Sequence, residues 1–130
     1  MLGPVMNLTV MYNPMNNTVE VMWEDMDNMV EDITYQVSYN ITVAEVLLRS
    51  NQTRVVPDVD LLDNILFNYV ISEGEFLQAG VRVSVEVAPY NMTERGPSEF
   101  AMVDVNGGRN KCIMHVNKES QFSFGIVILL

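Results

Sequence analysis

The chain has 130 residues, a length that suits a single domain with its own hydrophobic core. It carries 17 acidic and 7 basic residues, for a net charge of −10, and its Lys and Arg residues form no cluster. Proteins that bind nucleic acid or anionic membrane surfaces need clustered cations, so the composition argues against both as partners.

Apolar residues recur with a period of two along most of the chain, and this pattern predicts β-strands. No stretch shows a comparable helical period. Pro14, Pro57 and the acidic stretches at 24–32 and 58–63 interrupt the pattern. In chain order, the expected strands cover residues 5–12, 19–23, 33–39, 43–48, 53–56, 65–71, 81–87 and 99–105.

Short strands with turn signals about every ten residues are typical of an antiparallel sandwich. Each strand has one apolar and one polar face, so each sheet should be covered on one side only. A parallel α/β fold would need continuously apolar strands with helices between them. The sequence therefore predicts an all-β, antiparallel two-sheet sandwich of about seven strands over residues 1–105, followed by an irregular tail over residues 106–130.

The alternation also predicts which side chains face the core. Trp23 stands at an inward position of its strand, where a large aromatic residue normally fills the core rather than stacking on a ligand. The inward positions that we expect to be buried include Trp23, Tyr35, Val37, Tyr39, Val83 and Val85.

Two groups of residues resemble fibronectin type III domains. The first group is similar to the family's strands A, B and C, and it comprises Pro4, Leu8, Val10, Val19-x-Val21-x-Trp23 and Tyr35-x-Val37-x-Tyr39. The second is similar to its E–F corner, F strand and F–G loop, and it comprises the alternation from Leu77 to Val87, Asn91 and Gly96-Pro97-Ser98. The resemblance covers residues 4–105.

Two features depart from the family pattern. Val83 stands where the family has its corner tyrosine, and Ala79 stands where it has the proline that faces this tyrosine. Because valine has no hydroxyl group, either other contacts hold the corner or the register differs. Residues 57–75 also form a longer connection than the family's usual D–E connection.

Five Asn-x-Thr sequons occur, whereas this composition gives roughly one by chance. Their acceptors are Asn7, Asn16, Asn40, Asn51 and Asn91. This excess favours a glycoprotein outside the cell or at its surface, as part of a larger membrane or secreted protein. The alternative is that Asn and Thr are simply common on polar strands and turns. A single cysteine, Cys112, allows no intrachain disulfide and fits either location.

The two ends of the chain give weaker signals. Residues 1–4 lead directly into strand-like alternation, without the basic start and apolar core of a secretory signal. Residues 122–130 are apolar, but nine residues are less than half of the roughly 20 that span a bilayer. They are either the first part of a transmembrane helix, or a strand or loose tail.

The family often binds ligands through three loops at one end of its sandwich, which correspond here to residues 24–32, 57–64 and 91–96. The resemblance therefore implies a partner-binding end. Its candidate residues are Glu24, Asp25, Asp27, Glu31, Asp32, Met92, Glu94 and Arg95. The family's integrin-binding Arg-Gly-Asp tripeptide is absent.

The acidic residues among them are more typical of a solvated loop than of a calcium site, because the spacing and the turn glycine of an EF-hand are absent. Such a loop could steer a basic partner. Several of the ten methionines fall near strand ends and loops, where they either replace Leu and Ile as filler or form an adaptable surface.

Nothing in the sequence predicts catalysis, since it has one histidine, no Gly-x-Ser-x-Gly motif and no phosphate-binding glycine loop. Cys112 and His115 are three residues apart, but two ligands do not complete a zinc site, so we expect no metal or cofactor. We expect a non-catalytic protein-binding module of a receptor or adhesion protein, whose partner is a protein ligand or a neighbouring domain. The alternative is a passive spacer domain.

Overall fold

The computed structural model describes residues 2–25, 32–57, 66–105 and 113–116, which form β-strands, turns and a short 3-10 helix, Gly74–Phe76. The strands are β1 (Met6–Asn13), β2 (Thr18–Glu24), β3 (Thr34–Val43), β4 (Val46–Val55), β5 (Leu66–Ile71), β6 (Arg82–Tyr90), β7 (Glu99–Asp104) and β8 (Ile113–Val116). No helix within these ranges has the length and apolarity needed to cross a membrane.

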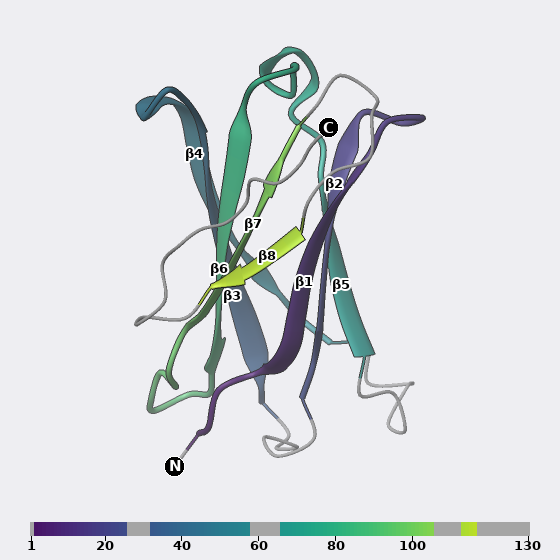
Figure 1. Ribbon diagram of the computed structural model, residues 1–130. Coiled ribbons are helices and arrows are strands. Elements are labelled where there is room, and N and C mark those ends of the chain that lie inside the picture. Colours follow the sequence, from purple (N-terminus) through teal and green to yellow (C-terminus); the bar gives the residue numbers. More distant parts are fainter. Residues whose placement is uncertain (1, 26–31, 58–65, 106–112, 117–130) are drawn as a thin grey trace.

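The strands form two antiparallel sheets, with the orders β1-β2-β5 and β4-β3-β6-β7-β8. The first seven strands are thus divided three and four between the sheets, which confirms the prediction of an all-β antiparallel sandwich. Along one side of the sandwich, β1 also contacts β7 and β8. Figure 1 shows the N-terminus and the β6–β7 turn at one end, and the β1–β2 turn, the β3–β4 turn and the 3-10 helix at the other.

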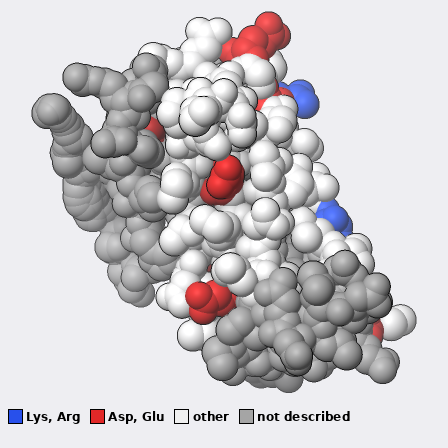
Figure 2. All heavy atoms as spheres, turned by 90° about the vertical axis from the view of Figure 1, so that its right-hand side faces the viewer, with Lys and Arg blue, Asp and Glu red and all other residues white. Residues whose placement is uncertain are grey.

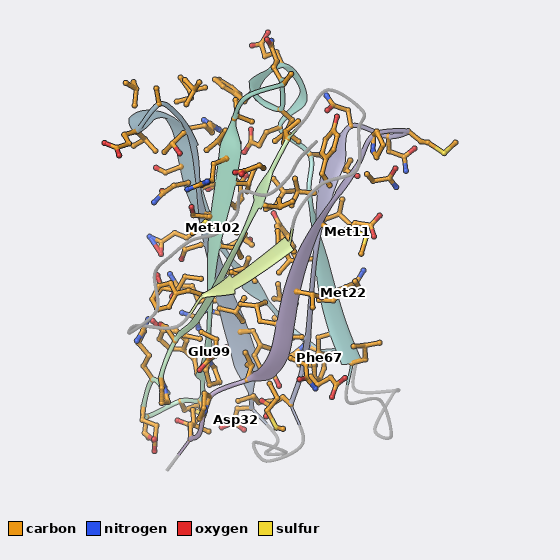
Figure 3. The ribbon with its side chains drawn as sticks, viewed as in Figure 1. Met11, Met22, Asp32, Phe67, Glu99 and Met102 are labelled. Atoms are coloured by element: carbon orange, nitrogen blue, oxygen red, sulfur yellow. The ribbon has the colours of Figure 1, made fainter. Side chains whose placement is uncertain are left out.

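The core forms because the strands alternate as expected. In β2, Val19, Val21 and Trp23 are buried, while the residues between them are partly exposed. All six side chains that the alternation placed in the core are buried. Phe67 and Tyr69 of β5, an edge strand of the three-stranded sheet, pack against this core. Figure 3 shows the side chains between the two sheets.

The β3–β4 hairpin corrects the strand prediction. Residues 43–48 and 53–56 were expected to be separate strands, but β3 runs to Val43 and β4 is continuous from Val46 to Val55. The turn lies at Ala44 and Glu45, whose φ angles of 49° and 69° are those of a two-residue hairpin turn that normally takes Asn and Gly. The sequence therefore carried no turn signal at this point.

A second correction concerns the tail. Residues 113–116, which were expected to be irregular, form β8 and pair with β7. The outer edge of β7 offers unpaired backbone groups, and an antiparallel strand satisfies them. Residues 106–112 and 117–130, including Cys112 and the apolar segment 122–130, lie outside the described residues.

The corner between β5 and β6 is held without a tyrosine hydroxyl from position 83. Val83 is buried in β6, whereas Ala79 is exposed in the turn that precedes it. Backbone bonds close the corner, from Gly80 N to Val105 O at 2.7 Å and from Val105 N to Val81 O at 2.9 Å.

A side-chain hydrogen bond also connects this corner to the larger sheet. The hydroxyl of Tyr39 in β3 donates to Glu73, which also pairs with Arg49 of β4 at 3.1 Å. Glu73 thus connects the segment before the 3-10 helix to β3 and β4.

Candidate functional site

The β6–β7 loop lies at the end of the sandwich that carries the N-terminus. Tyr90 and Arg95 form a β-bridge, and Asn91 N donates to Glu94 O at 3.0 Å. Gly96 N donates to Pro89 O at 2.8 Å. A Cβ atom on Gly96 would lie only 2.7 Å from Pro89 Cγ, so the close approach of the chain requires glycine here.

Asn91 organises the tip of this loop. Its Oδ1 atom accepts hydrogen bonds from Thr93 N and Glu94 N, both at 2.8 Å, and from Thr93 Oγ1 at 3.1 Å. This arrangement is an Asx turn, in which a side chain replaces a backbone acceptor. Both polar residues of the fifth sequon thus shape the loop.

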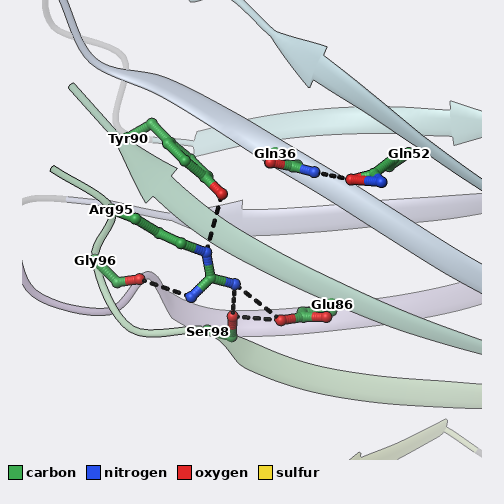
Figure 4. A network of polar contacts seen from close by, with 7 residues as sticks. All are labelled: Gln36, Gln52, Glu86, Tyr90, Arg95, Gly96 and Ser98. Atoms are coloured by element: carbon green, nitrogen blue, oxygen red, sulfur yellow. Dashed lines mark hydrogen bonds and ion pairs between the residues drawn. The ribbon is translucent and has the colours of Figure 1, made fainter. Parts of the chain in front are cut away.

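Arg95 ties the loop to the outer face of the larger sheet (Figure 4). Its guanidinium donates to Tyr90 Oη at 3.0 Å, to Glu86 Oε2 at 3.0 Å and to Ser98 Oγ at 2.6 Å. The Ser98 hydroxyl in turn donates to Glu86. Charge-assisted bonds of this kind restrict a loop at little cost, because the planar guanidinium loses few additional rotamers.

A second arginine joins this network from β4. Arg54 Cζ lies 4.1 Å from the centroid of the Tyr90 ring, and Arg54 Nη1 donates to Thr34 Oγ1 at 3.2 Å. Arg95 Cζ lies 5.8 Å from the same ring. Cation–π contacts at exposed sites are worth about 0.5–1 kcal/mol each, so Tyr90 links β4, β6 and the loop.

The three loop residues expected to bind a partner have different roles. Arg95 is held by the network, and Glu94 Oε2 accepts a hydrogen bond from Leu2 N at 2.9 Å, which fixes the N-terminal segment. Met92 is 84 % exposed at the tip. Of the three, Met92 is therefore the exposed apolar side chain.

The acidic stretch between β2 and β3 is not uniformly solvated. Asp25 is fully buried (0 % exposed), and its Oδ2 atom accepts a hydrogen bond from Tyr35 Oη at 2.7 Å. The expectation of a solvated Asp25 that meets a partner is therefore wrong. Glu24 ends β2 and accepts a bond from Asn7, while Asp32 is exposed beside the start of β3. Asp27 and Glu31 lie outside the described residues, as do residues 58–64.

Asp25 lies beside an aromatic cluster. Tyr35 is 5.4 Å from Trp23 and 4.9 Å from Phe67, measured between ring centroids. Burial, followed by the hydrogen bond to Asp25 and its charge, raises the pKa of the Tyr35 hydroxyl far above its usual value. The phenol therefore stays neutral and donates to the carboxylate. Trp23 Nε1 is buried with no hydrogen-bond partner among the described residues.

Four of the five sequon acceptors are exposed in the structure, namely Asn7, Asn16, Asn40 and Asn51. Asn40 lies on the outer face of the larger sheet, because its neighbours Tyr39 and Ile41 point into the core. Asn51 pairs with Tyr39 and lies on the edge strand β4, while Asn91 is half-buried in its turn. Modification at the first four acceptors requires no opening of the core.

Within the described ranges, no group of three or more His, Cys, Asp or Glu side chains is placed to hold a metal ion. At the loop end these ranges place one exposed apolar side chain, Met92, beside the guanidinium groups that stack near Tyr90. Tyr90 and Arg54 were not predicted as site residues, although the strand period places Tyr90 outward, on the face of Glu86.

Comparison with models of known protein families finds no match to this chain. Comparison with curated proteins also finds no match.

Proposed function

We propose that the chain is a fibronectin type III-like module from the extracellular part of a receptor or adhesion protein. It binds a protein ligand or a neighbouring domain and catalyses no reaction. Three observations support the proposal: the division of the strands between the sheets, the exposed sequon acceptors and the rigid loop that presents Met92.

The position of β4 supports the type of sandwich. In constant immunoglobulin domains the fourth strand joins the sheet of the first two strands. Here β4 pairs with β3 and belongs to the sheet of β6 and β7. Together with the sequence resemblance over residues 4–105, this arrangement favours a fibronectin type III-like domain over a constant immunoglobulin domain.

The observation that carries the binding role is the exposure of Met92 on an ordered loop. Binding hot spots are side chains that become fully buried in a pocket of the partner, and a preorganised loop loses little entropy when it binds. Methionine also adapts its shape to the surface that it meets. Arg54 and Arg95, stacked near Tyr90, flank the loop with polar groups suited to the rim of an interface.

Replacing Met92 with aspartate should weaken partner binding at least about tenfold, since a charged side chain cannot enter an apolar pocket without a cost above about 1.4 kcal/mol. Binding of the purified chain to a panel of cell-surface ectodomains, measured by surface plasmon resonance, checks this. The matched control is Met15→Asp, because Met15 is 92 % exposed in the turn at the opposite end. Equal binding by the wild type and both variants would show that Met92 does not contact the partner, and binding to none of the ectodomains would support the passive spacer instead.

The extracellular location predicts that the exposed sequons are used, whereas a glycan on the half-buried Asn91 would crowd Met92 beside it. When the chain is expressed behind a secretory leader, its electrophoretic mobility should increase after treatment with an N-glycan-removing enzyme. The variant in which all five acceptor asparagines are replaced with glutamine should migrate like the treated wild type. If the untreated wild type and this variant migrate identically, the acceptors are unused and the location is not supported.

A further inference from the structure

The outer face of the three-stranded sheet carries acidic side chains set among apolar ones. Its apolar members with exposures between 38 % and 50 % are Met6, Met11, Leu66 and Val70, and Met22 is partly exposed between them. Its acidic members are Glu20 and Glu24. We refer to these seven residues as the Met–Glu face; Figure 3 labels Met11 and Met22 on it.

The strand registers order this face in rows, because paired residues of adjacent strands share a face. Glu24 lies between Met6 of β1 and Leu66 of β5. In the same way, Glu20 lies between Met11 and Val70. Each carboxylate is therefore flanked on both sides by apolar side chains.

Between these two rows, Met22 lies between Thr9 and Asn68. Along β2 the outward side chains are therefore acidic at Glu20, apolar at Met22 and acidic again at Glu24. Four residues of extended chain separate the two carboxylates by roughly 13 Å.

The carboxylates of this face have no cation beside them among the described residues. Glu24 accepts from Asn7 Nδ2 at 3.0 Å, and Glu20 accepts from Asn13 Nδ2 at 3.3 Å, both neutral donors. The described arginines belong to β4, β6 and the β6–β7 loop: Arg49, Arg54, Arg82 and Arg95. Figure 2 shows this side of the molecule, where the described residues form separate acidic groups among uncharged ones, with basic atoms at the margin.

The distribution of sequons leaves the centre of this face open. The acceptor Asn40 interrupts the outer face of the larger sheet, whereas the acceptors near the Met–Glu face lie at the ends of β1, at Asn7 and in the turn at Asn16. A glycan on Asn7 would border Glu24. Glu20, Met11 and Val70 lie two rows away.

We propose that the Met–Glu face is a second interaction surface, distinct from the loop end. Its partner is a protein segment that presents a basic, an apolar and a basic side chain in turn, with its two cations roughly 13 Å apart. The basic side chains pair with Glu20 and Glu24, and the apolar side chain packs on Met22. Apolar side chains that flank each carboxylate strengthen its ion pair once the partner excludes water.

The probe is a disulfide-cyclised β-hairpin peptide. One face carries two lysines with a leucine midway between them, and threonine occupies the alternate positions. The full chain, labelled with ¹³C at its methionine methyl groups, is titrated with this peptide and followed by NMR. The Met11 and Met22 signals should shift and saturate, while those of Met15 and Met92 at the two ends should not.

Two charge variants with the same net charge complete the test. Glu20→Lys should weaken binding of the peptide at least about fivefold, and Glu45→Lys, in the β3–β4 turn, less than about twofold. Circular dichroism establishes that both variants fold. Equal weakening by the two variants would show general charge attraction and overturn the proposal.

Two further outcomes decide the proposal. Equal binding of a peptide with glutamates in place of its lysines would overturn it, and so would shifts confined to Met15 or Met92. Met92→Asp should bind the peptide like the wild type, so that failure of the loop-end function is distinguished from failure of this surface.

Discussion

Replacing Asp25 with alanine is expected to lower the free energy of unfolding by about 3 kcal/mol, because it leaves the buried Tyr35 hydroxyl without its acceptor. Asp25 is completely buried, and the bond that it accepts from Tyr35 is 2.7 Å long. Alanine would also leave a small cavity beside the aromatic rings. Urea denaturation followed by tryptophan fluorescence measures the change, since Trp23 is the sole tryptophan and lies in the same cluster.

The control for this prediction is Asp32→Ala, which removes an exposed carboxylate just before β3 and should change stability by less than about 0.5 kcal/mol. A double-mutant cycle with Tyr35→Phe isolates the pair. Because the second substitution removes the orphaned hydroxyl, the double variant should be more stable than the sum of the single effects predicts. Equal effects of Asp25→Ala and Asp32→Ala would show that the buried pair does not stabilise the fold.

The prediction gives Asp25 a structural role next to the proposed binding end. It fixes the end of β2 to the start of β3 through Tyr35, as Glu94 fixes the N-terminal segment to the β6–β7 loop. Binding residues on loops need such a rigid scaffold. The buried acid therefore supports the proposed binding end without being exposed on it.

The fold could be predicted from the sequence because the strand period is local information. The alternation around Trp23 and from Tyr35 to Tyr39 places each large side chain on a definite face, and burying these faces against each other requires two sheets. The turn at Ala44 and Glu45 could not be predicted in this way. Its positive φ angles are sustained by the long pairing of β3 with β4, and neither residue type favours them.

The burial of Asp25 could not be predicted either, because it depends on a residue ten positions away. Five acidic residues within residues 24–32 predict a solvent-exposed loop. Tyr35 becomes the partner of Asp25 only when the two sheets, which contain β2 and β3 respectively, pack against each other. The exposed Asp32 shows that the same stretch contains both environments. Composition over a window of nine residues averages over this difference.

The loop network was predictable in part. Tyr90 and Glu86 lie four residues apart on one strand, so the period of two places them on the same face, and a tight hairpin brings Arg95 back towards them. Arg54 comes from β4, which pairs with β3 and not with β6. Its position over Tyr90 follows from the register of three strands, which the sequence alone does not determine.

High pH should destabilise the fold through two of its buried tyrosines. Burial and the bond to Asp25 raise the pKa of Tyr35 far above 10.0, and burial and the bond to Glu73 raise the pKa of Tyr39 to about 12. Their stabilising contribution is complete below the unfolded pKa of about 10, since both states are then protonated. Above it the unfolded chain releases protons that the folded chain retains, so stability falls as pH rises.

Each of these tyrosines should contribute a slope of up to about 1.4 kcal/mol per pH unit above pH 10, ending for Tyr39 near its folded pKa of about 12. Urea midpoints measured from pH 8 to about pH 11.5 check the slope. The Tyr35→Phe substitution should reduce this slope by the contribution of one titrating tyrosine. Val37→Ala is the control, because it destabilises the same core strand without removing an ionisable group. It should lower stability at every pH and leave the slope unchanged. A flat profile in the wild type, or an equal slope in Tyr35→Phe, would show that the Tyr35 hydroxyl is not held neutral beside Asp25.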